Sequence, residues 1–139
     1  MRYWFDTEFI EDGKTIDLIS IGIVCEDGRE RYYESDECDL DRASPWVKEN
    51  VLPHLIGGGA VLSRKQIADH LVSFVCPNPE FWAYYADYDW VAMCQLFGTM
   101  IDLPNSWPMY CRDVKQLCDD LGNPKLPEQK SSEHMAITD

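Results

Sequence analysis

The chain has 139 residues, a length typical of one domain, and its 25 acidic against 12 basic residues give a net charge of −13. Apolar residues make up 45% of the chain, which is enough to bury a core and excludes a disordered acidic tail. No run of about 18 apolar residues occurs, and the N-terminus lacks the apolar stretch of a signal peptide. We therefore expect a soluble, cytoplasmic protein without a membrane partner.

The strong negative charge narrows the classes of function. An acidic surface repels phosphate backbones, so nonspecific binding of nucleic acid is disfavoured. Two classes stay open: an enzyme that binds nucleic acid through metal ions, and a non-catalytic protein that imitates nucleic acid. The six cysteines lack the spacing of a zinc site, and without a secretory signal we expect them to stay reduced.

The first part of the chain predicts an antiparallel meander. Aromatic and polar side chains alternate along residues 2–9, which indicates a strand, and residues 11–14 form a turn. Residues 18–25 are nearly all apolar, as expected of a strand that is covered on both faces. A hairpin signal at 27–28 then leads into a third, half-exposed strand over residues 29–34.

Helices are predicted next. Ser44 followed by Pro45 is typical of a helix N-terminus. The three glycines at 57–59 form a loop that is too short to separate two domains. Ser63 is expected to cap a second helix, whose apolar residues fall on one face.

Strands and helices alternate in the remainder of the chain. We expect a strand over 80–85, a helix after Asp89, a strand beginning at Met109, and a helix capped by Asp113 and ended by Gly122. The order predicts one α/β domain with a mixed five-stranded sheet, in which three antiparallel strands precede two parallel ones and helices flank the sheet.

Two carboxylates share one face of the first strand. Asp6 and Glu8 are two residues apart, so both side chains point the same way, and they interrupt an otherwise apolar strand. Two like charges placed together are costly unless a cation neutralises them, and hard divalent cations prefer oxygen ligands. The pair therefore indicates a site for a divalent metal ion.

Three further residues could complete such a site. Asp89 lies at the junction between a strand and a helix, where its alternative role is that of a helix N-cap. His134 and Asp139 are five residues apart and converge only if His134 lies in a loop and Asp139 begins a helix.

The five residues in this order resemble the DEDDh group of 3′–5′ exonucleases, which have a ribonuclease H-like fold. The stretches FDTEFI (5–10), LISIG (18–22) and YDWVAMCQL (88–96) are most similar to a small bacterial and phage exoribonuclease branch related to ribonuclease T and oligoribonuclease. The resemblance covers essentially the whole chain.

The resemblance implies a reaction and a role for each residue. Asp6, Glu8, Asp89 and Asp139 would hold two Mg²⁺ or Mn²⁺ ions and His134 would be the general base, so that all five are catalytic. The expected reaction is hydrolysis of phosphodiester bonds at single-stranded RNA 3′ ends or in short oligonucleotides, which releases nucleoside 5′-monophosphates.

Substrate contacts and assembly are less constrained by the sequence. Phe9 and Thr7 flank Glu8 and are the candidate substrate contacts, with Phe9 able to stack on a terminal base. The choice between RNA and DNA, the preferred base and a homodimeric state stay open. The alternative function is a non-catalytic acidic interaction protein on the same fold.

The resemblance also concerns the C-terminal end of the sequence. In the family, the helix that carries the last Asp continues for several turns, whereas this sequence ends at Asp139. The expectation is a single exonuclease domain, 1–139, that lacks its C-terminal helix. Its residues 134–139 should then be mobile, or held only by neighbouring contacts, and its metal sites incompletely formed.

Overall fold

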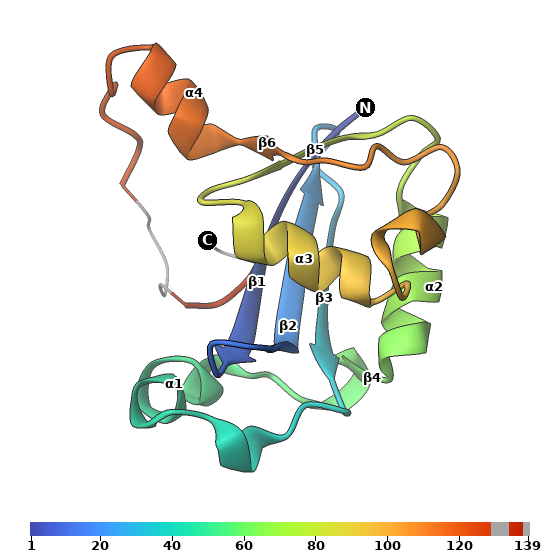
Figure 1. The fold of residues 1–139 in the computed structure, drawn as a ribbon, viewed down its shortest axis with the longest axis vertical. Coiled ribbons are helices and arrows are strands. Elements are labelled where there is room, and N and C mark those ends of the chain that lie inside the picture. The colour runs from blue at the N-terminus through green and yellow to red at the C-terminus, as the bar shows by residue number, and fades with distance from the viewer. Residues whose placement is uncertain (129–133, 138–139) are drawn as a thin grey trace.

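The computed structural model describes residues 1–128 and 134–137. These residues form one six-stranded sheet, in the order β4-β3-β2-β1-β5-β6, and four α-helices (Figure 1). The strands are β1 (Arg2–Glu11), β2 (Ile16–Cys25), β3 (Glu30–Ser35), β4 (Val61–Leu62), β5 (Glu80–Ala83) and β6 (Arg112–Asp113). The α-helices are α1 (Pro45–Asn50), α2 (Arg64–Phe74), α3 (Asp87–Gln95) and α4 (Val114–Asp120), and short 3₁₀ helices cover Leu40–Arg42, Leu52–His54, Gly58–Ala60 and Met100–Asp102.

The predicted α/β class is confirmed. Strands β1, β2 and β3 are antiparallel neighbours, whereas β5 runs parallel to β1 and β6 parallel to β5. This mixed sheet, flanked by helices, has a ribonuclease H-like arrangement. Strand β1 lies in the interior of the sheet, between β2 and β5, so it provides a rigid base for the side chains it carries.

Two details of the sheet differ from the sequence prediction. A sixth strand, β4, adds two residues parallel to β3, because Val61 and Leu62 pair with Glu34 and Ser35. The last parallel strand begins at Arg112 rather than at Met109, because only Trp82 and Ala83 of β5 have a partner there. A two-residue strand has no periodicity of its own, so its position depends on the strand beside it.

Three of the predicted helix starts, those of α1, α2 and α4, are confirmed by their caps, whereas α3 begins at Asp87 rather than after Asp89. The Ser44 side chain accepts a hydrogen bond from the Val47 N–H at the start of α1, where Pro45 is the first helical residue. At α2, Ser63 forms a reciprocal capping box with Gln66. The Asp113 carboxylate accepts hydrogen bonds from backbone N–H groups in the first turn of α4.

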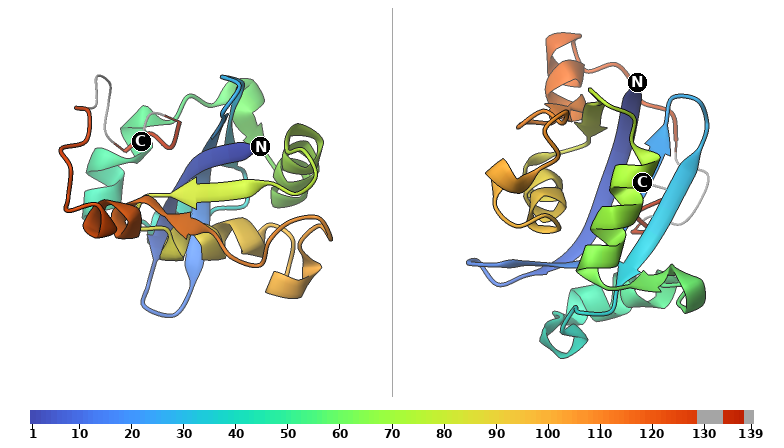
Figure 2. Two further views of the ribbon diagram at one scale, coloured as in Figure 1. Left: turned by 90° about the horizontal axis from the view of Figure 1, so that it is seen from above. Right: turned by 90° about the vertical axis from the view of Figure 1, so that its right-hand side faces the viewer.

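The two faces of the sheet are covered differently. Helices α2 and α3 lie on one face, and the C-terminal segment lies on the other (Figure 2). The main core fills the space beneath the two helices, where aromatic side chains of β1 and β5 pack against them. A smaller cluster on the other face, at the α1 end of the sheet, joins Ile10 and Ile19 to Ala43 and Val51.

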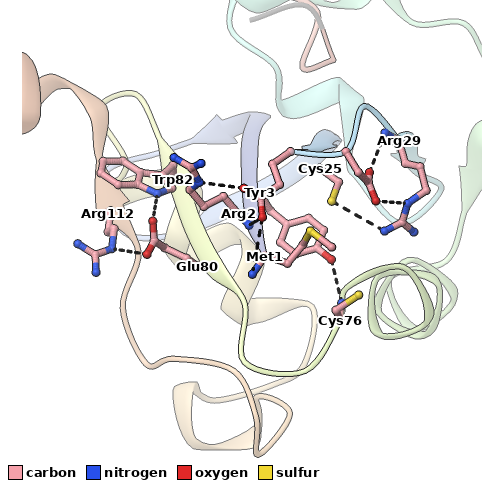
Figure 3. A network of polar contacts seen from close by, with 11 residues as sticks. Met1, Arg2, Tyr3, Cys25, Arg29, Cys76, Glu80, Trp82 and Arg112 are labelled. Atoms are coloured by element: carbon pink, nitrogen blue, oxygen red, sulfur yellow. Dashed lines mark hydrogen bonds and ion pairs between the residues drawn. The ribbon is translucent and has the colours of Figure 1, made fainter.

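A polar network joins the strands at the beginning of β1 (Figure 3). The Glu80 carboxylate accepts a hydrogen bond from the Trp82 indole N–H at 2.7 Å and forms an ion pair with Arg112 at 3.5 Å. The Tyr3 hydroxyl accepts a hydrogen bond from the Cys76 N–H at 2.9 Å. The first two contacts stabilise β5 and its pairing with β6, and the third joins β1 to the segment between α2 and β5. All six cysteines are free thiols.

Candidate active site

Strand β1 presents its two acidic side chains away from the main core. Tyr3 and Phe5 belong to the main core beneath α2 and α3. Asp6 and Glu8 therefore lie on the opposite face, because successive side chains of a strand alternate. Their partners across the β1–β2 pair are Gly22 and Ser20. The sheet thus places both carboxylates on the face that the C-terminal segment covers.

Asp89 lies at the edge of β1, where β5 has left it. Strand β5 pairs with β1 only as far as Trp4. Beyond that point the Thr7 N–H donates a hydrogen bond to the Asp89 carboxylate at 2.9 Å, and the Thr7 hydroxyl donates to the same oxygen at 2.6 Å. The carboxylate takes the place of a strand partner, so Asp89 is fixed beside the stretch of β1 that carries Asp6 and Glu8.

Asp89 is a buried acid in the first turn of α3. Asp89 is only 6% exposed. Burial raises the pKa of its carboxyl, while the two hydrogen bonds from Thr7 lower it. The helix begins after Ala86, whose side chain makes no capping hydrogen bond, so Asp89 is not the N-cap. An acid that is buried at a cost to its charged form is a candidate for a functional role.

His134 and Asp6 line the same cavity. This cavity has a volume of about 1000 Å³ and is also lined by the aromatic side chains of Trp4, Trp82 and Tyr84. The His134 ring packs edge-on against Trp46 of α1, with 4.9 Å between ring centroids. Its backbone has φ of 65°, a left-handed conformation that is uncommon for residues other than glycine and often occurs at functional sites.

The segment that carries His134 rests on the sheet. Ala136 is 3% exposed, and its backbone lies directly over Gly22. Residues 134 and 136 thus have neighbouring contacts, and the expectation that residues 134–139 are mobile or held only by such contacts stays a prediction. Asp139, the fourth expected ligand, lies outside the described residues.

The two expected substrate contacts have partners within the protein. Thr7 is buried on the core side of β1 and donates both of its hydrogen bonds to Asp89. Phe9 is half-buried and its ring lies 5.7 Å from that of Tyr88 in α3. A contact of either residue with substrate stays a prediction.

Glu34 is a buried acid that the sequence analysis missed. It lies on the same sheet face as Glu8, since Ser20 of β2 pairs with both residues. Its carboxylate accepts hydrogen bonds from the Tyr32 hydroxyl at 3.0 Å and from the backbone N–H groups of Ile56, at 2.6 Å, and Gly57, at 3.0 Å. Glu34 thereby binds the loop at residues 56–57 to the sheet.

The donor chemistry around β1 fits a divalent cation. Asp6 and Glu8 lie on β1, and the Asp89 carboxylate of α3 accepts hydrogen bonds from Thr7, the residue between them. All three offer oxygen, the ligand atom that Mg²⁺ and Mn²⁺ prefer. Within residues 1–128 and 134–137, no group of three or more His, Cys, Asp or Glu side chains gathers closely enough to hold a metal ion.

Of the helices in residues 1–128 and 134–137, none has both the length and the apolar character needed to cross a bilayer.

Fold and site together define an α/β domain of ribonuclease H-like arrangement with an acidic pair on an interior strand. A family model described as the 3′–5′ exoribonuclease Rv2179c-like domain matches residues 1–139. The chain belongs to this family.

Two relatives from Mycobacterium tuberculosis are similar over the whole chain. They are the 3′–5′ exoribonuclease Rv2179c of strain ATCC 25618 / H37Rv and the 3′–5′ exoribonuclease MT2234.1 of strain CDC 1551 / Oshkosh. Each is 47% identical over 145 residues, which cover 100% of this chain and 86% of the relative.

Proposed function

We propose that this chain is a 3′–5′ exoribonuclease of the DEDDh type that depends on two divalent metal ions. The observation that carries the proposal is the family match over residues 1–139, within which Asp6 and His134 line one cavity. The substrate is RNA with a free 3′ end or a short oligonucleotide, and the product is a nucleoside 5′-monophosphate.

Asp6, Glu8, Asp89 and Asp139 would hold the two ions, Mg²⁺ or Mn²⁺. When bound, the two ions supply positive charge that stabilises the attacking and leaving oxygens at the phosphorus atom. The interior position of β1 fixes the backbone of Asp6 and Glu8, while Thr7 orients Asp89 through two hydrogen bonds to one oxygen. Of the four expected donors, Asp6 and Glu8 are thus carried by an interior strand and Asp89 is hydrogen-bonded to it.

His134 would act as the general base. Its imidazole takes a proton from water as the water oxygen bonds to phosphorus and the bond from phosphorus to the 3′ oxygen breaks. The contact with Trp46 and the packing of Ala136 on the sheet hold the ring in the cavity that Asp6 lines. Both contacts are formed without substrate, so they hold the His134 ring before substrate binds.

The net charge of −13 bears on the form of the substrate. Outside the metal site an acidic surface repels phosphates, which disfavours long contacts along a nucleic acid and favours short or single-stranded 3′ ends. The same charge underlies the alternative, a non-catalytic acidic protein that imitates nucleic acid.

A single-stranded RNA labelled at its 5′ end tests the proposal. With Mg²⁺ or Mn²⁺ we expect a ladder of products shortened from the 3′ end together with nucleoside 5′-monophosphates. The same RNA with a 3′-phosphate, or with EDTA in the reaction, should stay intact. Internal cleavage, or shortening that EDTA does not prevent, contradicts the proposal, and intact RNA under all conditions favours the non-catalytic alternative.

A further inference from the structure

The backbone of the C-terminal segment lies directly over Gly22 of β2. A Cβ atom built on this residue would lie 2.1 Å from the carbonyl oxygen of Ala136, 2.3 Å from its carbonyl carbon and 2.5 Å from the Cα atom of Ile137. All three are backbone atoms, so no rotation of a side chain could relieve the overlap. Any other residue at position 22 would displace the segment or the strand.

The conformation of β2 does not explain this glycine. Gly22 is absent from the positive-φ residues, which include six of the eight glycines, so its backbone is one that any residue can adopt. Glycine also weakens the interior of a strand, where it often marks a close approach of another backbone. The segment lying over Gly22 is that other backbone.

Gly22 is also the cross-strand partner of Asp6. The segment that rests on it therefore lies beside the first carboxylate of the site, and His134, two residues before Ala136, lines the cavity that Asp6 lines. Ala136 is buried by this contact, so the depth at which the segment rests is set by the surface of β2. Adding one carbon atom at position 22 would raise that surface.

We infer that Gly22 is a positioning residue for the reaction: its missing side chain sets the depth at which residues 134–137 rest on the sheet and so places His134 in the cavity that Asp6 lines. The inference rests on the proposed function, in which His134 is the base. It assigns no chemistry to Gly22, which acts only through the segment above it.

The test compares Gly22→Ala with Gly59→Ala in the full chain. Gly59 is a matched control, because it also lacks a positive φ and a Cβ atom there would have no neighbour within 4 Å. We expect Gly22→Ala to fold with the circular dichroism spectrum of the wild type and to lower kcat about 10²-fold, the cost of misplacing a catalytic group by about 1 Å. Gly59→Ala should keep the kcat of the wild type.

A readout that does not depend on activity follows the position of His134 directly. The Trp46 ring shifts the NMR signals of the His134 imidazole, and Trp46→Ala supplies the reference for their unshifted positions. In Gly22→Ala these signals should move toward that reference, and in Gly59→Ala they should not. This comparison holds even if the wild type leaves RNA intact, in which case the proposed function fails while the placement of His134 is still decided.

Either of two results overturns the inference. Unchanged His134 signals in Gly22→Ala would show that the segment does not depend on the glycine. A Gly22→Ala protein that fails to fold, beside a folded Gly59→Ala, would show that the sheet itself requires the glycine.

Discussion

Alternate residues of β1 serve two faces of the sheet that are built in different ways. Tyr3 and Phe5 point into the core beneath α2 and α3, where their rings pack against other aromatic side chains. Asp6 and Glu8 point to the other face, where their partners on β2 are Gly22 and a buried serine. The first face is a packed core, whereas the second carries two acidic side chains and the contact between Gly22 and the backbone of residues 136–137.

The difference teaches where stability and activity reside in this fold. Burial of large apolar side chains stabilises the core face, whereas two neighbouring carboxylates repel each other. A substitution on the core face should therefore lower stability, and one on the carboxylate face should lower activity alone.

Asp6→Asn should produce the largest effect. If Asp6 holds a metal ion, its loss lowers the rate of RNA shortening by about 10⁴-fold, comparable to the loss of one member of a catalytic triad. The melting temperature without metal should stay the same or rise, because one of two repelling charges is removed. Rates of 3′ shortening in Mg²⁺ and melting followed by circular dichroism check both parts.

The control for Asp6→Asn is Asp69→Asn. Asp69 is an exposed acid on α2 that pairs with Lys65 one turn away, so its loss removes the same charge at a distance from β1. It should leave the rate unchanged. Near-normal turnover of Asp6→Asn would exclude Asp6 from the metal site, and a large fall in its melting temperature would contradict the separation of the two faces.

His134→Ala should lower the rate by about 10² to 10⁴-fold, the usual contribution of a general base. Its melting temperature should change little, since Trp46, on which the ring packs, is itself 53% exposed. The pH–rate profile provides the sharper measurement, because its acidic limb should disappear with the base. A variant that keeps the limb assigns proton transfer to another group.

On the core face, Phe5→Ala should lower the free energy of unfolding by about 3–5 kcal/mol. Phe5 is 5% exposed and its ring lies 6.0 Å from that of Phe81 and 6.3 Å from that of Trp90, so truncation leaves a cavity. Its neighbour Trp4 is 39% exposed on the other face, and Trp4→Ala should cost about 1 kcal/mol or less. Urea unfolding measures the free energy of unfolding of both variants. Equal losses of stability would contradict the difference between the two faces of β1.

Much of this fold could be predicted because its signals are local. Alternation identified β1, and Ser44, Ser63 and Asp113 identified the starts of three helices, because a cap acts within one turn of its own residue. Strand β4 could not be predicted, since two residues carry no period and its place depends on β3. The beginning of β6 depends in the same way on the short exposed edge of β5.

In the candidate site, too, the features set by neighbouring residues could be predicted and those set by distant residues could not. The face shared by Asp6 and Glu8 follows from their spacing alone, and the structure places His134 in the same cavity as Asp6. Glu34 was missed because its partners, the N–H groups of residues 56 and 57, are more than twenty residues away. Gly22 was missed for the same reason: the backbone that rests on it belongs to the far end of the chain.

Asp89, at the edge of β1, gives the smallest and most specific prediction. Burial raises the pKa of its carboxyl above the value in the unfolded chain, so the folded state disfavours the charged form. The cost to stability is therefore absent below the unfolded pKa, grows as pH rises through the folded pKa, and is complete above it.

Asp89→Asn removes this charge and keeps an oxygen that can accept both hydrogen bonds from Thr7. We expect the variant to melt at a higher temperature than the wild type at pH 7 in EDTA, with a difference that shrinks toward zero as the pH is lowered into the acidic range. As a proposed metal ligand it should nevertheless lose activity, so that one substitution raises stability and lowers turnover. A stability difference that is independent of pH would show that the charge of Asp89 is not what the fold disfavours.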